Sequence, residues 1–204
     1  MVRRTLIQVV TIGALGVTAA RAQSTGTPSF MAPYRAFERS ELGGTLSFPG
    51  FNNGVALEGD YRFGYKKFDL GIRSGFFDRS GLGSTAFLIG AEARTRVITH
   101  TEDFPMDGAI VFGLGGSFAS GSSGFIIPGG LSLGRRFDLP DSKVSIVPYA
   151  QPTLFITGGD QRDTQIQFAF GIGTDFRLSR VLDARVSMGF GDLDGIAFSM
   201  VYVH

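Results

Sequence analysis

The stretch that decides the fold is residues 55–65, VALEGDYRFGY, in which apolar side chains alternate with charged or small ones. Val55 and Leu57 fall on one face of an extended chain, whereas Glu58 and Asp60 fall on the other. Successive side chains of a β-strand point to opposite sides, so a period of two indicates a strand between two different environments.

The same alternation recurs along the chain, in residues 68–73, 87–97, 166–178, 182–190 and 196–204. About nine clusters of turn-forming residues divide the chain into about ten such strands. We therefore predict an all-β fold, an up-and-down antiparallel transmembrane β-barrel of about ten strands over residues 40–204. An even number of strands places both ends of the barrel domain on one side.

Three prolines inside predicted strands keep a second topology open. Pro128, Pro148 and Pro152 each lack the N–H group that a closed barrel needs at every position. We expect bulges or a local break near these prolines. The alternative is an eight-stranded barrel that leaves one hairpin of residues 117–156 outside.

The number of bulky side chains determines which face points outward. About ten strands with roughly five apolar side chains each present more bulk than the interior of a barrel this narrow can hold. A bulky apolar exterior suits lipid, where closed barrels satisfy every backbone polar group. The tyrosines that we expect at the membrane interfaces are Tyr61, Tyr65, Tyr149 and Tyr202.

Six acidic and six basic side chains share the opposite, small-residue face. Inside the barrel each can pair with an opposite charge across neighbouring strands, whereas a base on the lipid face would cost about 2 to 4 kcal/mol. Arginine suits such pairing because its planar fork matches a carboxylate. We therefore predict a charge network that plugs the lumen, made of Glu58, Asp60, Arg62, Asp69, Arg73, Glu92, Arg94, Arg96, Asp175, Arg177, Asp183 and Arg185.

Residues 1–22 have the features of a cleaved signal peptide: Arg3 and Arg4, an apolar run over residues 6–17, and an Ala-Arg-Ala site ending at Ala22. The run is too short for a membrane anchor. Residues 23–39 show no sustained period and are interpreted as an N-terminal tail. Export without any cysteine fits a bacterial envelope protein that is not stabilised by disulfides.

The end of the chain carries the most specific resemblance. Phe198, Met200, Tyr202 and His204 lie on the apolar face of the last predicted strand, although His204 departs from the usual terminal Phe. In this pattern the chain resembles small bacterial outer-membrane β-barrels of the OmpA or OmpX type. The resemblance implies a location in the cell outer membrane among outer-membrane lipid and lipopolysaccharide, with the last strand as the signal for the barrel-assembly machinery. We expect a monomer.

The composition of the chain excludes several classes of function. The formal net charge of +1 leaves no basic surplus for nucleic acid, and the absence of cysteine excludes thiolate metal sites. We predict a non-enzymatic barrel with an envelope structural role or porin-like passage of small molecules, with no cofactor, metal or catalytic residue. Turn carboxylates such as Asp160 and Asp192 could hold a divalent cation but are more typical of turns.

Two alternatives remain. A lipid-modifying envelope enzyme would have to use His100 or His204, and the carboxylate near His100 is Glu102 in a polar turn. A soluble lipocalin-like barrel would instead place the apolar face inside and bind lipid there.

Overall fold

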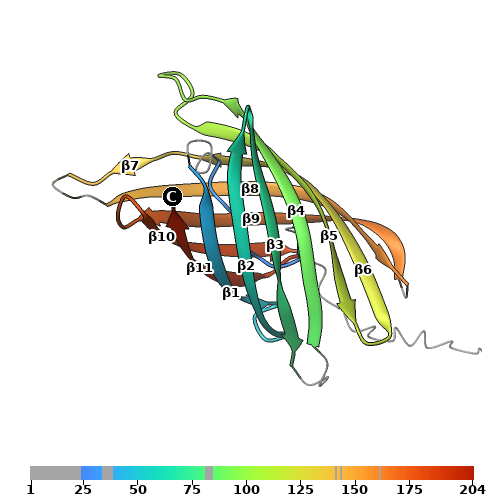
Figure 1. Cartoon of the computed structure of the whole chain (residues 1–204). Helices are drawn as coiled ribbons and strands as arrows, with labels where there is room; N and C mark the ends of the chain where they lie inside the picture. The colour runs from blue at the N-terminus through green and yellow to red at the C-terminus, as the bar shows by residue number, and fades with distance from the viewer. Residues whose placement is uncertain (1–23, 34–38, 81–84, 141, 143, 161) are drawn as a thin grey trace, which may run out of the picture.

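The computed structural model describes residues 24–33, 39–80, 85–140, 142, 144–160 and 162–204. The predicted signal peptide lies outside these residues. The described residues form a closed antiparallel β-barrel of ten long strands with one short additional strand (Figure 1). They contain no helix long and apolar enough to cross a membrane.

The strands vary in length from 2 to 16 residues. Their bounds are β1 Glu41–Pro49, β2 Gly54–Tyr65, β3 Phe68–Arg79, β4 Thr85–Ile98, β5 Asp107–Ala119, β6 Ser122–Gly134, β7 Phe137–Asp138, β8 Ser145–Gly159, β9 Arg162–Arg177, β10 Leu182–Gly191 and β11 Gly195–Val203.

Each long strand pairs with its neighbours in the sequence, and the short β7 does not interrupt the barrel. β6 pairs directly with β8, while β7 pairs only with the first two residues of β8. The barrel closes where β1 pairs with β11 along its whole length. The prediction of about ten strands is confirmed. The eight-stranded alternative is wrong, because β6 and β8 both belong to the closed sheet.

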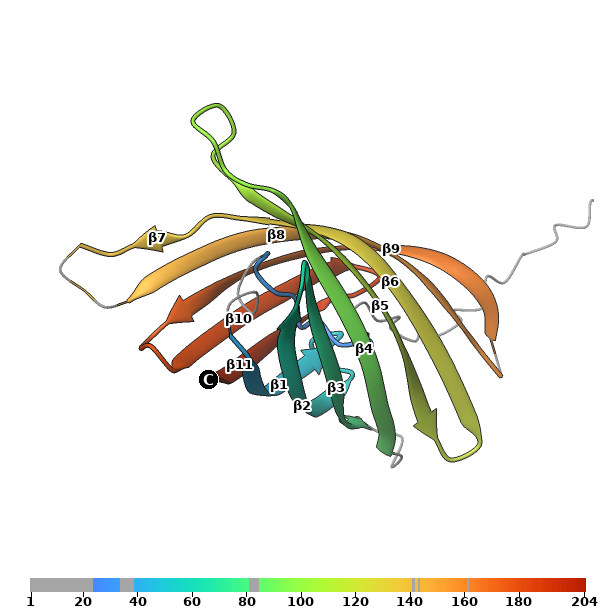
Figure 2. The same cartoon turned by 45° about the horizontal axis from the view of Figure 1, so that its top comes forward.

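The two ends of the barrel domain meet, as an even strand number requires. Ser40 and His204 exchange two backbone hydrogen bonds of 3.1 and 3.0 Å. The two longest connections described, β4–β5 and the segment from β6 to β8 that carries β7, extend from this same end (Figures 1 and 2).

The prolines interrupt the ladder locally without changing its register. Pro128 would face Gly113 of β5, and Pro152 would face Leu131 of β6, but neither pair forms. The pairs on either side keep one register, so each site is a break of two positions, as expected for residues that cannot donate. Pro148 lies in an uninterrupted part of the β8–β9 ladder.

The exterior of the barrel is apolar. Leu57, Leu114 and Ile166 are 65%, 64% and 76% exposed. Bulky apolar side chains are exposed on this outer face in every long strand, and in β8 they occur only in its second half. Such a continuous apolar surface is suited to lipid. The lipocalin-like alternative is wrong, since the interior carries the charges rather than the apolar face.

One expected interfacial tyrosine faces the other way. Tyr61, Tyr65 and Tyr202 are exposed on the outer surface, but Tyr149 is buried inside the barrel. In β8 the inward positions are Val147, Tyr149 and every second residue as far as Phe155. The sequence of this strand carries no charges that would mark its inner face, so Tyr149 could not be assigned to the interior from alternation alone.

Candidate functional site

The lumen gathers most of the charged side chains that the sequence placed there. Ten are buried, namely Glu58, Asp60, Arg62, Asp69, Arg73, Glu92, Arg94, Asp175, Asp183 and Arg185. Arg96 is exposed and Arg177 is half-buried. These two lie near the ends of β4 and β9, at the end of the barrel that carries Ser40 and His204.

The first ion cluster joins β2, β3 and β4. Arg62 forms an ion pair with Glu92 and lies 3.8 Å from Asp69, and the Arg94 Nε is 3.4 Å from the same Asp69 carboxylate. Arg62 and Glu92 are two strands apart, with Gly71 between them in the register. A side chain at Gly71 would meet the guanidinium at about 3.2 Å, so the glycine is what lets Arg62 reach across.

The second ion cluster joins β1, β9 and β10. Arg185 donates to Glu41 at 2.7 Å, and its Nε lies 3.1 Å from an Asp175 carboxylate oxygen. Glu41 was missed by the sequence analysis. The alternation of Glu41, Gly43 and Thr45 against Leu42 in β1 was the signal that could have found it.

Residues 24–33, which we name the luminal segment, lie inside the barrel rather than outside it. Figure 2 shows this blue stretch enclosed by the strands. Ser24, Phe30 and Ala32 are each 1% exposed. The sequence of this stretch is that of a tail, because its uncharged, aperiodic composition carries no signal for an interior position.

The wall of the lumen binds the backbone of this segment from four strands. Four of the segment's carbonyl oxygens accept hydrogen bonds: from Ser187 to Pro28 at 2.8 Å, Tyr149 to Phe30 at 2.6 Å, Ser132 to Met31 at 2.8 Å, and Arg94 to Ala32. The Phe30 N–H donates to Ser187 at 3.2 Å, and the Thr27 hydroxyl donates to Glu58 at 2.6 Å. The segment is thus held by polar contacts along its length.

Phe30 anchors the segment in an apolar pocket of the lumen. Its ring belongs to a buried cluster with Ile126, Val147, Tyr149, Phe155, Ala169 and Leu193. The ring lies against Gly171 and Gly189, where a Cβ would collide with it. The two glycines therefore form the floor of a site shaped for an aromatic side chain.

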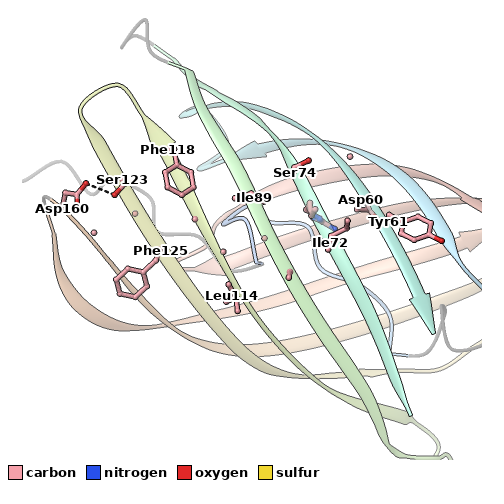
Figure 3. Close-up of a pocket in the computed structure, with 18 of the residues that line it drawn as sticks. Asp60, Tyr61, Ile72, Ser74, Ile89, Leu114, Phe118, Ser123, Phe125 and Asp160 are labelled. Carbon is pink, nitrogen blue, oxygen red and sulfur yellow. Dashed lines mark hydrogen bonds between the residues drawn. The ribbon is translucent and has the colours of Figure 1, made fainter. Parts of the chain in front are cut away.

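A separate hollow of about 1030 Å³ lies along the barrel wall from β1 to β6 (Figure 3). Exposed apolar side chains such as Ile72 and Leu114 line most of it. At one end Ser123 donates to Asp160 at 2.7 Å. The lining also includes Asp60 and Arg73, whose side chains are buried in the lumen, so the hollow contains residues of both faces of the barrel wall.

His100 and Asp107 form a hydrogen-bonded pair at the end of the barrel that carries Ser40 and His204. The His100 Nδ1 lies 3.0 Å from one Asp107 oxygen, and its backbone N–H donates to the other at 3.1 Å. The pair was missed because Glu102, not Asp107, was considered as the partner. No group of three or more potential ligands that could hold a metal occurs within the described ranges.

No protein-family model matches the chain, and no curated protein matches it in sequence. Among solved structures, the chain is similar to the β domain of the Bordetella autotransporter BrkA, with 10% identity and a TM-score of 0.50, over 80% of this chain and 96% of that one. It is also similar to the KdgM porin, with 8% identity and a TM-score of 0.41 over 79% and 98% of the two chains. At these identities the likeness concerns the fold alone.

The fold and the apolar outer surface define a transmembrane β-barrel. Its interior contains the two ion clusters and the luminal segment.

Proposed function

We propose that this protein is a non-enzymatic integral barrel of the outer membrane whose lumen is plugged by its own charges, with a structural role in the envelope. The observation that carries the proposal is the burial of ten charged luminal side chains, six of which belong to the two ion clusters. A hydrated channel would separate and screen such charges. Passage of small molecules is therefore less well supported than a structural role.

The outer-membrane location is supported by the fold and by the apolar exterior. It agrees with export through a cleaved signal peptide, with outer-membrane lipid and lipopolysaccharide as surroundings. Phe198, Met200 and Tyr202 lie exposed on the closing strand, where the barrel-assembly machinery would recognise them. The OmpA or OmpX type stays a prediction: barrels of that type have about eight strands, whereas this barrel has ten long strands.

Reconstitution into planar lipid bilayers tests the plugged lumen. The full mature chain should show no large, steady ion conductance, because paired charges and the luminal segment leave no continuous water path. Folded protein is verified beforehand by its far-ultraviolet circular dichroism. Large, steady conductance would replace this proposal by a porin.

The lipid-modifying alternative has one observation in its favour, the pairing of His100 with Asp107. A carboxylate that orients a histidine is a common arrangement around a general base. However, the same carboxylate also accepts from the His100 backbone, so it holds the β4–β5 loop in place. A His100→Ala variant should leave the lipid A composition of the cell unchanged, and an altered profile would favour the enzyme.

A further inference from the structure

The luminal segment is bound in the manner of a ligand. Four carbonyl oxygens accept hydrogen bonds from side chains of four different strands, and no charged residue occurs in the segment. Backbone-directed hydrogen bonds with one side-chain anchor are how peptide-binding sites commonly recognise an extended chain. The anchor is Phe30, seated against Gly171 and Gly189.

The wall is built for this occupant at several independent points. A Cβ at Gly90 or Gly115 would collide with the Ser24 carbonyl, and a Cβ at Gly171 would collide with the Phe30 ring. Each of these glycines leaves the volume that the segment fills. Such matching of small wall residues to a bulky segment resembles the complementarity of a binding site.

We propose that the lumen is a peptide-binding site for an uncharged segment with a phenylalanine anchor, and that residues 24–33 occupy it in cis. This inference rests on the proposed function for the closed state of the lumen. Peptide binding and ion conductance are separate measurements, so the two can fail independently.

The chemistry of the site defines what it accepts. Arg94 and Arg185 present donors that are already shared with Asp69, Glu41 or Asp175, so the peptide must supply neutral acceptors and not a further charge. Glu58 needs a donor, which the Thr27 hydroxyl provides. A peptide with a charge in place of Phe30 would place that charge in an apolar pocket and bind far more weakly.

The test uses the full mature chain in detergent and a fluorescent peptide with the sequence of residues 24–33. In the wild-type protein the cis segment occupies the site, so the peptide should show no specific binding. In Phe30→Asp the cis segment loses its anchor, and the peptide should bind about a hundredfold more tightly than to wild type, the factor expected for disrupting a buried phenylalanine. Fluorescence anisotropy measures the binding.

Matched controls distinguish binding at this site from nonspecific peptide binding. Phe51→Asp makes the same substitution at an exposed phenylalanine in the β1–β2 turn, so this variant should behave as wild type. A peptide carrying Asp in place of Phe30 should not bind either variant. If Phe30→Asp does not fold, Phe30→Ala is the milder variant that removes the same anchor.

Peptide binding alone decides whether the inference holds, and conductance decides only the proposed function. Absence of peptide binding to a folded Phe30→Asp or Phe30→Ala protein would overturn it, as would equal binding to wild type. If the peptide binds as expected while the wild-type chain conducts steadily in bilayers, the site stands and only the plugged-lumen function fails. If the wild type is closed and no variant binds peptide, only the peptide site fails.

Discussion

Replacing Arg185 by methionine tests how far the lumen is shielded from water. Arg185 is 4% exposed and serves two buried carboxylates, at 2.7 Å to Glu41 and 3.1 Å to Asp175. Removing one partner of a buried ion pair typically costs about 3 to 5 kcal/mol, because a charge is left behind in a poorly solvated place. Methionine keeps much of the volume, so the loss is electrostatic rather than a cavity.

The control is Arg136→Met, which removes an ion pair of similar geometry on the surface. Arg136 lies 2.8 Å from Asp138, with side chains 43% and 71% exposed. An exposed pair contributes about 0 to 1 kcal/mol, so this variant should be nearly as stable as wild type.

The assay is urea-induced unfolding in lipid vesicles, followed by circular dichroism because the chain contains no tryptophan. A third variant combines Arg185→Met with Glu41→Gln and Asp175→Asn, which leaves no charge at this cluster. It should recover part of the lost stability, since uncharged groups of similar shape cost less to bury than unpaired charges. A loss below about 1 kcal/mol for Arg185→Met, equal to that of Arg136→Met, would refute the shielded lumen.

Three further outcomes are expected. Glu92→Ala should destabilise the barrel by about 3 to 5 kcal/mol in the same unfolding assay, and Asp78→Ala, at an exposed strand end, by less than about 1 kcal/mol; similar losses would contradict the buried pairing. A cysteine at Phe168 should react only with membrane-soluble maleimide, while one at Ser123 reacts with the water-soluble reagent; ready labelling of both by the latter would reverse the orientation of the strands. Tyr149→Phe removes the donor to the Phe30 carbonyl and should cost about 1 to 3 kcal/mol in unfolding, whereas no change would mean that the segment is not held there.

Much of the barrel could be predicted because its two faces differ in chemistry at every second residue. In β2, Leu57 and Phe63 are exposed whereas Glu58 and Arg62 are buried, as the alternation indicated. The number of strands followed from the regular turns between such runs. The inner face of β8 was harder to assign, since Tyr149 alternates with prolines and small residues rather than with charges.

The partners within the charge network could not be read from alternation. A period of two shows that Glu92 and Arg62 point inward, but not that the register places Gly71 between them. Register depends on the turns and on the pairing of whole strands. The contact between Arg62 and Glu92 across β3 could therefore not be predicted from the sequence.

The luminal segment lay beyond sequence reasoning for a different physical reason. A strand is recognised by the two environments on its faces, but residues 24–33 are surrounded by protein on all sides and carry no charge. Nothing in such a stretch alternates, so its composition is that of an ordinary tail.

The segment and the charge network are one structure rather than two independent plugs. Arg94 is shared between Asp69 and the carbonyl of Ala32, and Arg185 between its carboxylates and the sulfur of Met31. The charges fix the arginine forks in position, and the forks in turn bind the segment. A hydrated lumen would leave the arginines satisfied by water and the segment without its donors, so in the function we propose the two depend on each other to exclude water from the lumen.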